Sequence, residues 1–111
     1  LYKWNVYFMS CKYNVAAMNF VEEYVVNAET GRPVFFLQVG DSYQHDGKDE
    51  VRIYFNEDSS PCFMQVTAKD AEGALIEKRE IKDIVNDTVF NYLMHSFDSY
   101  MESFASMMNV N

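Results

Sequence analysis

The hydrophobic period of the chain changes near residue 83, and this change constrains the fold more than any other feature. Before it, short segments alternate apolar and polar residues with a period of two, which is typical of half-buried strands. After it, apolar residues recur every three or four positions, as on one side of an amphipathic helix: Val85, Val89, Leu93, Phe97, Tyr100, Phe104 and Met108. The sequence therefore predicts an α+β fold. An antiparallel β-sheet of four to six strands, built as hairpins or a meander, should carry one long C-terminal amphipathic helix, about 84–108, packed on one face.

The alternation of apolar and polar residues predicts the positions of most of the strands. The first strand has Trp4, Val6 and Phe8 on its apolar side, which predicts that this side faces the core. Turn residues separate the later segments from one another. Strands are expected over residues 2–9, 34–39, 51–56, 62–69 and 74–82.

Two further segments are assigned from composition. Residues 15–27 leave both a helix and a strand open, because their Ala, Met and Glu residues favour a helix whereas their Phe, Tyr and Val residues favour a strand. The turn that follows contains Gly31 and Pro33, which makes a hairpin the more economical interpretation. Residues 40–50 are strongly polar and predict an exposed loop with an Asp-Gly turn.

The C-terminal helix has a clear start and an unusual end. Asp83 is the expected N-cap, and Asp87 lies in the first turn, where a carboxylate favours the positive end of the helix dipole. No Lys or Arg follows Lys82. Each missing C-terminal cation costs the helix about 0.3–1 kcal/mol, so its stability has to come from packing on the sheet.

Length and composition indicate one small globular domain. The chain has 111 residues, of which 49% are apolar and 23% charged, values that are ordinary for a folded protein. It contains no linker, internal repeat or low-complexity segment, and no apolar run approaches the roughly 18 residues that cross a membrane. Residues 1–111 are therefore expected to form a single domain, strand-rich over 1–82, with no membrane partner.

The net charge excludes one class of partner. The 17 acidic and 9 basic residues give a formal charge of −8. Such a chain repels phosphate backbones at neutral pH unless a local basic patch overrides its field, and the sequence shows no such patch. Direct nucleic-acid binding is therefore not expected.

No residue pattern points to catalysis or to a bound cofactor. His45, Asp46 and Asp49 lie in one predicted loop, but their spacing does not match a calcium loop. The 2 cysteines and 2 histidines lack the short paired spacings of zinc sites, and glycine-rich phosphate loops are absent. Cys62 falls on the apolar side of its strand and is expected to be an inert core thiol. The chain is therefore expected not to be an enzyme and to hold no metal or cofactor.

The cysteines also bear on the cellular compartment. Cys11 and Cys62 have neither the count nor the spacing of a disulfide-stapled scaffold, so free, buried thiols are the expected state. So few cysteines favour a reducing compartment, and the expected location is cytoplasmic.

Acidic residues gather in two groups that we take as the candidate partner-binding residues. Such groups steer positively charged partners toward a protein, although acidic surfaces also serve simply to keep small proteins in solution. The first group lies in the predicted loop and is extended in the next turn by Glu57 and Asp58: Asp41, Asp46, Asp49 and Glu50. The second group lies on the helix, opposite the apolar stripe: Asp87, Asp98 and Glu102.

These observations favour an acidic protein-binding module. We expect an inhibitor or immunity-type protein, such as one used by a phage against a defence enzyme, that blocks a basic, nucleic-acid-binding surface of its protein partner. Two alternatives stay open. In one, aromatic and methionine side chains line a cavity between sheet and helix, and the protein carries a small molecule or lipid. In the other, a structural subunit forms a homo-oligomer through an uncovered edge strand or an exposed aromatic patch.

Overall fold

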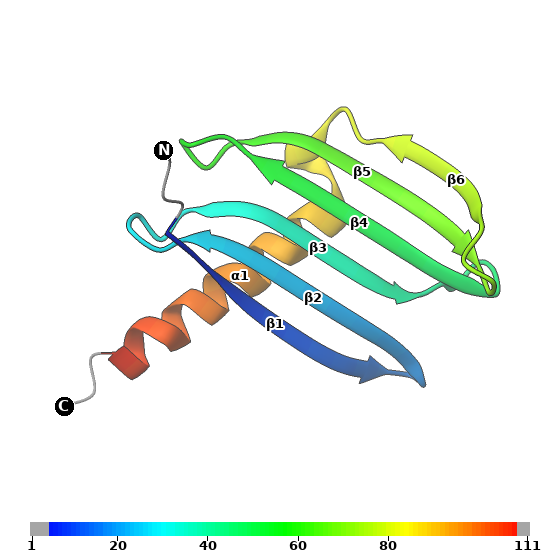
Figure 1. Cartoon of the computed structure of the whole chain (residues 1–111), viewed down its shortest axis with the longest axis horizontal. Coiled ribbons are helices and arrows are strands. Elements are labelled where there is room, and N and C mark those ends of the chain that lie inside the picture. The colour runs from blue at the N-terminus through cyan, green and yellow to red at the C-terminus, as the bar shows by residue number, and fades with distance from the viewer. Residues whose placement is uncertain (1–4, 109–111) are drawn as a thin grey trace.

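A computed structural model describes residues 5–108 of the chain as a six-stranded antiparallel sheet with one long helix. The strands pair in chain order, as a meander, and the helix crosses behind the sheet in the view of Figure 1. This confirms the predicted α+β fold. No helix of the described residues is both long and apolar enough to cross a membrane. The elements are β1 (Val6–Val15), β2 (Met18–Asn27), β3 (Pro33–Asp41), β4 (Gly47–Phe55), β5 (Pro61–Asp70), β6 (Leu75–Glu80), a short 3-10 helix (Ile84–Asn86) and α1 (Thr88–Met108).

The segment over residues 15–27, for which the sequence allowed either a helix or a strand, contains a strand. Residues 18–27 form β2, which pairs along its whole length with β1. The two strands are joined by Ala16 and Ala17, which have φ angles of 51° and 64°. Two successive residues with positive φ give the connection that matches the twist of a two-residue hairpin. Pairing on both sides of β2 therefore outweighs the helix propensity of its Ala, Met and Glu residues.

The core lies between one face of the sheet and α1. Tyr24, Phe36, Ile53 and Met64 pair in register across β2 to β5, and all four are fully buried. They pack with the buried helix residues Phe90, Leu93 and Phe97 in one hydrophobic cluster. The Phe36 and Phe97 ring centroids are 5.1 Å apart. The apolar stripe of the helix is thus buried in its middle, as the sequence predicts.

The prediction for the first strand was wrong about its buried side. Tyr7 and Met9 pack against the core, whereas Phe8, on the opposite side, is 69% exposed. The reason is that β1 carries apolar residues on both faces, and pairing decides between them. Tyr7 and Met9 lie opposite the buried Val26 and Tyr24 of β2. Residues 2–4, including Trp4, lie outside the described residues.

The predicted loop over residues 40–50 is shorter than expected. β3 extends to Asp41 and β4 begins at Gly47, so only residues 42–46 connect them. The polar flanks are strand because they pair, as Asp41 does with Lys48. Gly40 is needed here for space, because a Cβ atom at this position would overlap the Phe20 ring.

The helix α1 begins at Thr88, four residues later than the start at residue 84 that the predicted cap Asp83 would give. Oδ1 of Asp87 accepts hydrogen bonds from the backbone N–H groups of Val89 (2.9 Å) and Phe90 (3.0 Å), so Asp87 is the functional cap of α1. Asp83 precedes only the 3-10 helix and makes no side-chain cap hydrogen bond. The sequence prediction of Asp83 as the cap was therefore wrong, because the first apolar residues of the stripe belong to a separate short turn.

Candidate functional site

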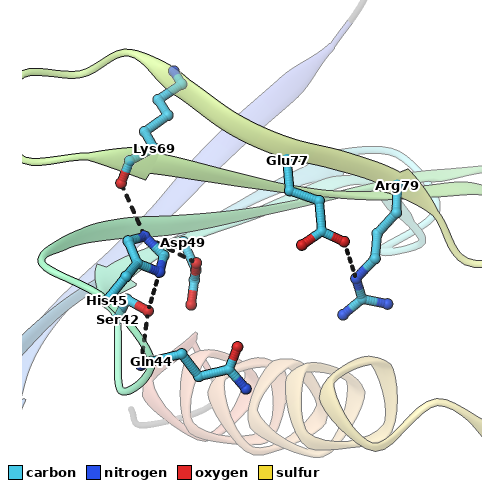
Figure 2. A network of polar contacts seen from close by, with 7 residues as sticks. All are labelled: Ser42, Gln44, His45, Asp49, Lys69, Glu77 and Arg79. Carbon is cyan, nitrogen blue, oxygen red and sulfur yellow. Dashed lines mark hydrogen bonds and ion pairs between the residues drawn. The ribbon is translucent and has the colours of Figure 1, made fainter.

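The connection between β3 and β4 is held in place by its histidine. Nε2 of His45 lies 3.0 Å from the Lys69 carbonyl oxygen of β5, and Nδ1 lies 2.9 Å from the Ser42 hydroxyl (Figure 2). A carbonyl only accepts, so Nε2 carries a proton and donates it, while Nδ1 shares a hydrogen bond with the Ser42 hydroxyl. Both ring nitrogens are therefore used in fixing the loop. Within residues 5–108, no group of three or more His, Cys, Asp or Glu side chains is arranged to hold a metal ion.

Two acidic residues of this region, Asp41 and Glu50, form ion pairs with neighbouring cations. Asp41 lies 2.8 Å from the Lys48 ammonium group and also accepts the backbone N–H of Asn19 at 2.8 Å. The Asn19 hydrogen bond, followed by that from Lys48, holds the pKa of Asp41 below its usual value. Glu50 lies 3.3 Å from the Arg52 guanidinium group. The net negative charge of this region is accordingly smaller than the acidic residues alone suggest.

The first acidic group does not form one surface. Asp49 pairs in register with Gly40 on the helix side of the sheet, whereas Glu50, the next residue, points to the opposite side. Asp46 is exposed in the connection. Glu57 and Asp58 lie in the β4–β5 turn, at the other end of β4 (Figure 1).

One hollow joins members of the two acidic groups. It has a volume of about 250 Å³, lies between the sheet and the start of α1, and is lined in part by Asp41, Asp49 and Asp87. Arg79 of β6 lines it as well, so the hollow is mixed in charge. Since Asp87 caps the helix and Asp41 pairs with Lys48, two of these three carboxylates already have structural roles.

The outer side of α1 keeps its acidic character. Asp98 and Glu102 are exposed one turn apart, and the helix contains no Lys or Arg. His95 is also exposed on this helix. In the second acidic group, Asp98 and Glu102 are therefore the carboxylates that are exposed to solvent and have no cation on the same helix.

A buried glutamate in β2 was missed by the sequence analysis. Glu22 is fully buried, and its carboxylate accepts hydrogen bonds from the hydroxyls of Tyr13 and Tyr24, each at 2.5 Å. The Gln38 amide donates a third, at 3.4 Å. Burial, and then the hydrogen bond to Glu22, raises the pKa of both tyrosines above the usual value. Once residues 18–27 are read as strand, the signal is visible, since Glu22 shares the core face with Tyr24 and Val26.

Both cysteines are free, as expected. The expected burial is wrong, because Cys11 is only half-buried and Cys62 is exposed. Cys62 is exposed, because a register shift at Tyr54 and Phe55 interrupts the alternation of β5 at its start. The prediction of Cys62 as a core thiol was therefore wrong. Cys11 is half-buried, and its side chain beside the Tyr100 hydroxyl, followed by burial, raises the pKa of Tyr100 above its usual value. A cavity of about 140 Å³ lies next to this pair.

The sheet face away from α1 is uncovered by any other part of the described chain (Figure 1). Across it runs a row of apolar residues, one from each of the first five strands, paired in register. The ring centroids of Phe35 and Tyr54 are 4.8 Å apart, and those of Tyr54 and Phe63 are 5.9 Å apart. We call this set the apolar row: Phe8, Val25, Phe35, Tyr54 and Phe63.

In comparisons with known proteins, no family model, no curated protein and no solved structure matches this chain.

Proposed function

We propose that this chain is an acidic protein-binding module of the inhibitor or immunity type, which acts by covering a basic, nucleic-acid-binding surface of a partner enzyme. The observation that carries the proposal is the outer side of α1. It presents Asp98 and Glu102 to solvent, in a helix without Lys or Arg, on a protein of formal charge −8. Uncompensated carboxylates on a rigid element steer a basic partner and set its orientation.

The contacts within the structure support a smaller set of proposed partner-binding residues. Asp41 and Glu50 already pair with Lys48 and Arg52, and Asp87 caps α1, so these three carboxylates have structural partners. We therefore assign the first contact with the partner to Asp98 and Glu102. Asp46 and Asp49, at the far end of the sheet, contribute to the overall negative field but not to this surface.

The carrier alternative has less support. The cavity beside Tyr24 and Tyr100, where sheet and helix meet, has a volume of about 140 Å³. Pockets that enclose a small organic ligand usually measure about 300–1,000 Å³. The larger hollows of the described residues, of about 250–490 Å³, lie at the ends of the sheet or at the start of α1 and are lined by charged side chains as well.

The test is a capture experiment with three matched baits from a lysate of the source organism. The baits are the wild-type chain, Asp98→Lys/Glu102→Lys, and a control, Glu57→Lys/Glu72→Lys, which makes the same charge change in two exposed turns. We expect a protein with a basic surface to be captured by the wild type and the control and to be lost from the helix variant. Equal capture by all three baits would refute the assignment of the helix face.

A further inference from the structure

We propose that two copies of this chain associate face to face through the uncovered side of the sheet, about a two-fold axis close to parallel with β3. The starting observation is the apolar row, whose members Phe8 and Tyr54 are 69% and 40% exposed. Contiguous apolar surface of this kind on a small protein marks an interface. The inference does not depend on the proposed function, because α1 and this face lie on opposite sides of the sheet.

The central strand of the face suits a two-fold axis. β3 is the middle strand of the five that carry the apolar row, and it presents Phe35, Leu37 and Val39 on this side. Residues on a two-fold axis meet their own copies, so a charge there would meet a like charge. These three residues are apolar, and self-contact therefore buries them without an electrostatic cost. Asp41, at the end of β3 on the same side, keeps its ion pair with Lys48 at 2.8 Å.

The charges on either side of β3 select the orientation of the axis. Leu37 pairs in register with Glu23 of β2 on one side and with Arg52 of β4 on the other. A two-fold axis parallel to β3 exchanges β2 with β4 and keeps residues that pair across the strands at the same height along the axis. Glu23 of each copy therefore faces Arg52 of the other copy, which gives two such contacts. An axis perpendicular to the strands would instead place Glu23 against Glu23 and Arg52 against Arg52. Charge complementarity therefore favours the parallel axis.

The same axis matches the remaining members of the apolar row. It sets Phe8 of β1 against Phe63 of β5, and Val25 of β2 against Tyr54 of β4, because these residues lie at equal numbers of strands from β3. Val39 pairs in register with Val21 of β2 and with Glu50 of β4, so Glu50 of one copy faces Val21 of the other. The Glu50 carboxylate keeps its ion pair with Arg52 of its own copy, at 3.3 Å. Face-to-face sheets of this kind pack about 10 Å apart and interleave their side chains.

The available area is sufficient for a stable dimer. Strands β1 to β5 have 9 or 10 residues each. At about 4.8 Å between strands and about 3.4 Å per residue, they offer a face of roughly 24 by 30 Å, or about 700 Å² per copy. Two copies would bury about 1,400 Å², within the range of about 1,200–2,000 Å² that is usual for specific interfaces.

The first measurement is the mass of the full wild-type chain by light scattering at about 100 μM, a concentration at which a micromolar Kd gives mainly dimer. We expect twice the monomer mass of 13.0 kDa. A monomer mass at this concentration would overturn the proposal. The same result is expected if the uncovered face binds a different protein instead of a second copy.

The second measurement uses charge reversal. Arg52→Glu and Glu23→Arg each create two like-charge contacts across the axis, and we expect each to weaken dimerisation tenfold or more. Arg79→Glu, which makes the same charge change on the helix side of the sheet, should leave the dimer intact. Circular dichroism checks that each variant is folded.

The decisive step is to mix the two single variants in equal amounts. In a mixed dimer, Glu23 of the Arg52→Glu chain faces Arg52 of the Glu23→Arg chain, and the two substituted positions face each other with opposite charges as well. We therefore expect the mixture to have the mass of a dimer at a dilution where the wild type is still dimeric and each variant alone is monomeric. Because the two variants and the mixture are independent samples, the loss of one variant through misfolding still leaves the other to be compared with the wild type. A wild-type dimer that survives both reversals, or two monomeric variants whose mixture stays monomeric, would overturn the proposed arrangement.

Discussion

The Tyr24 hydroxyl donates a 2.5 Å hydrogen bond to the carboxylate of Glu22, two positions earlier on the same face of β2. Both residues are fully buried, and Tyr13 completes the arrangement from β1 at the same distance. No Lys or Arg of residues 5–108 forms an ion pair with Glu22, so tyrosine and amide donors alone solvate this carboxylate. The network ties β1, β2 and β3 together under α1.

Removing this carboxylate should destabilise the protein. Glu22→Ala leaves two tyrosine hydroxyls without their acceptor, and we expect the free energy of unfolding to fall by about 3 kcal/mol, measured by urea denaturation. Glu22→Gln keeps one acceptor oxygen and should cost less. Glu29→Ala, in an exposed turn, is the matched control and should stay within about 0.5 kcal/mol of the wild type. A Glu22→Ala variant as stable as this control would contradict the role of the network.

The tyrosines of the network should make the protein sensitive to alkali. Burial and the hydrogen bond to Glu22 raise the pKa of Tyr24 above its ordinary value of 10.0, and the pKa of Tyr13 is raised in the same way. A raised pKa means that the folded state holds the proton more tightly, so this stability is fully present below pH 10 and is lost as the pH rises beyond it. Tyrosinate absorbance should show tyrosines that ionise only as the protein unfolds. Complete ionisation near pH 10 in the folded protein would contradict this.

The β1–β2 turn offers a stabilising substitution. Ala16 and Ala17 both have positive φ, a conformation that costs an L-residue about 1–2 kcal/mol relative to glycine. Ala17→Gly should therefore raise the free energy of unfolding by about 1 kcal/mol, and thermal unfolding measures this as a higher Tm. Ala71→Gly, in the exposed β5–β6 turn, removes the same methyl group without relieving a positive φ and should give no increase. Equal effects of the two substitutions would argue against strain in the Ala16–Ala17 turn.

Two aspartates distinguish the observed helix start from the expected one. Asp87→Ala removes the acceptor for two backbone N–H groups of α1 and should lower the free energy of unfolding by about 1 kcal/mol. Asp83→Ala removes only an exposed side chain that hydrogen-bonds to Asn86, so its effect should be smaller. Urea denaturation of both variants gives the comparison. A larger loss for Asp83→Ala would place the cap where the sequence pattern suggested.

The parts of the fold that follow from local pattern could be predicted from sequence. The helix stripe centred on Leu93 and Phe97 and the alternation through Val51 and Ile53 depend on residues close together in the chain. Strand boundaries were less accurate. Asp41 and Lys48 look like loop residues in sequence, and only their pairing across the sheet makes them strand.

The candidate site was less predictable, because it depends on which side of the sheet each residue faces. Tyr7 and Phe8 are aromatic neighbours in sequence, and pairing with β2 under α1 decides that Tyr7 packs against the core while Phe8 is exposed. The same rule separates Asp49 from Glu50 and splits an acidic group that looks continuous in sequence. Glu22 appears as an ordinary polar residue until its segment is known to be a strand.

The proposed function is tested most directly by the association kinetics of the captured partner with two variants at increasing ionic strength. For the wild type and for Glu57→Lys/Glu72→Lys, the association rate should fall as salt rises, because steering fades beyond a Debye length of about 8 Å at physiological ionic strength. Asp98→Lys/Glu102→Lys should associate more slowly at low salt and depend less on salt. If this folded variant associates at the wild-type rate at low salt, the outer side of α1 is not the binding surface and the proposed function fails.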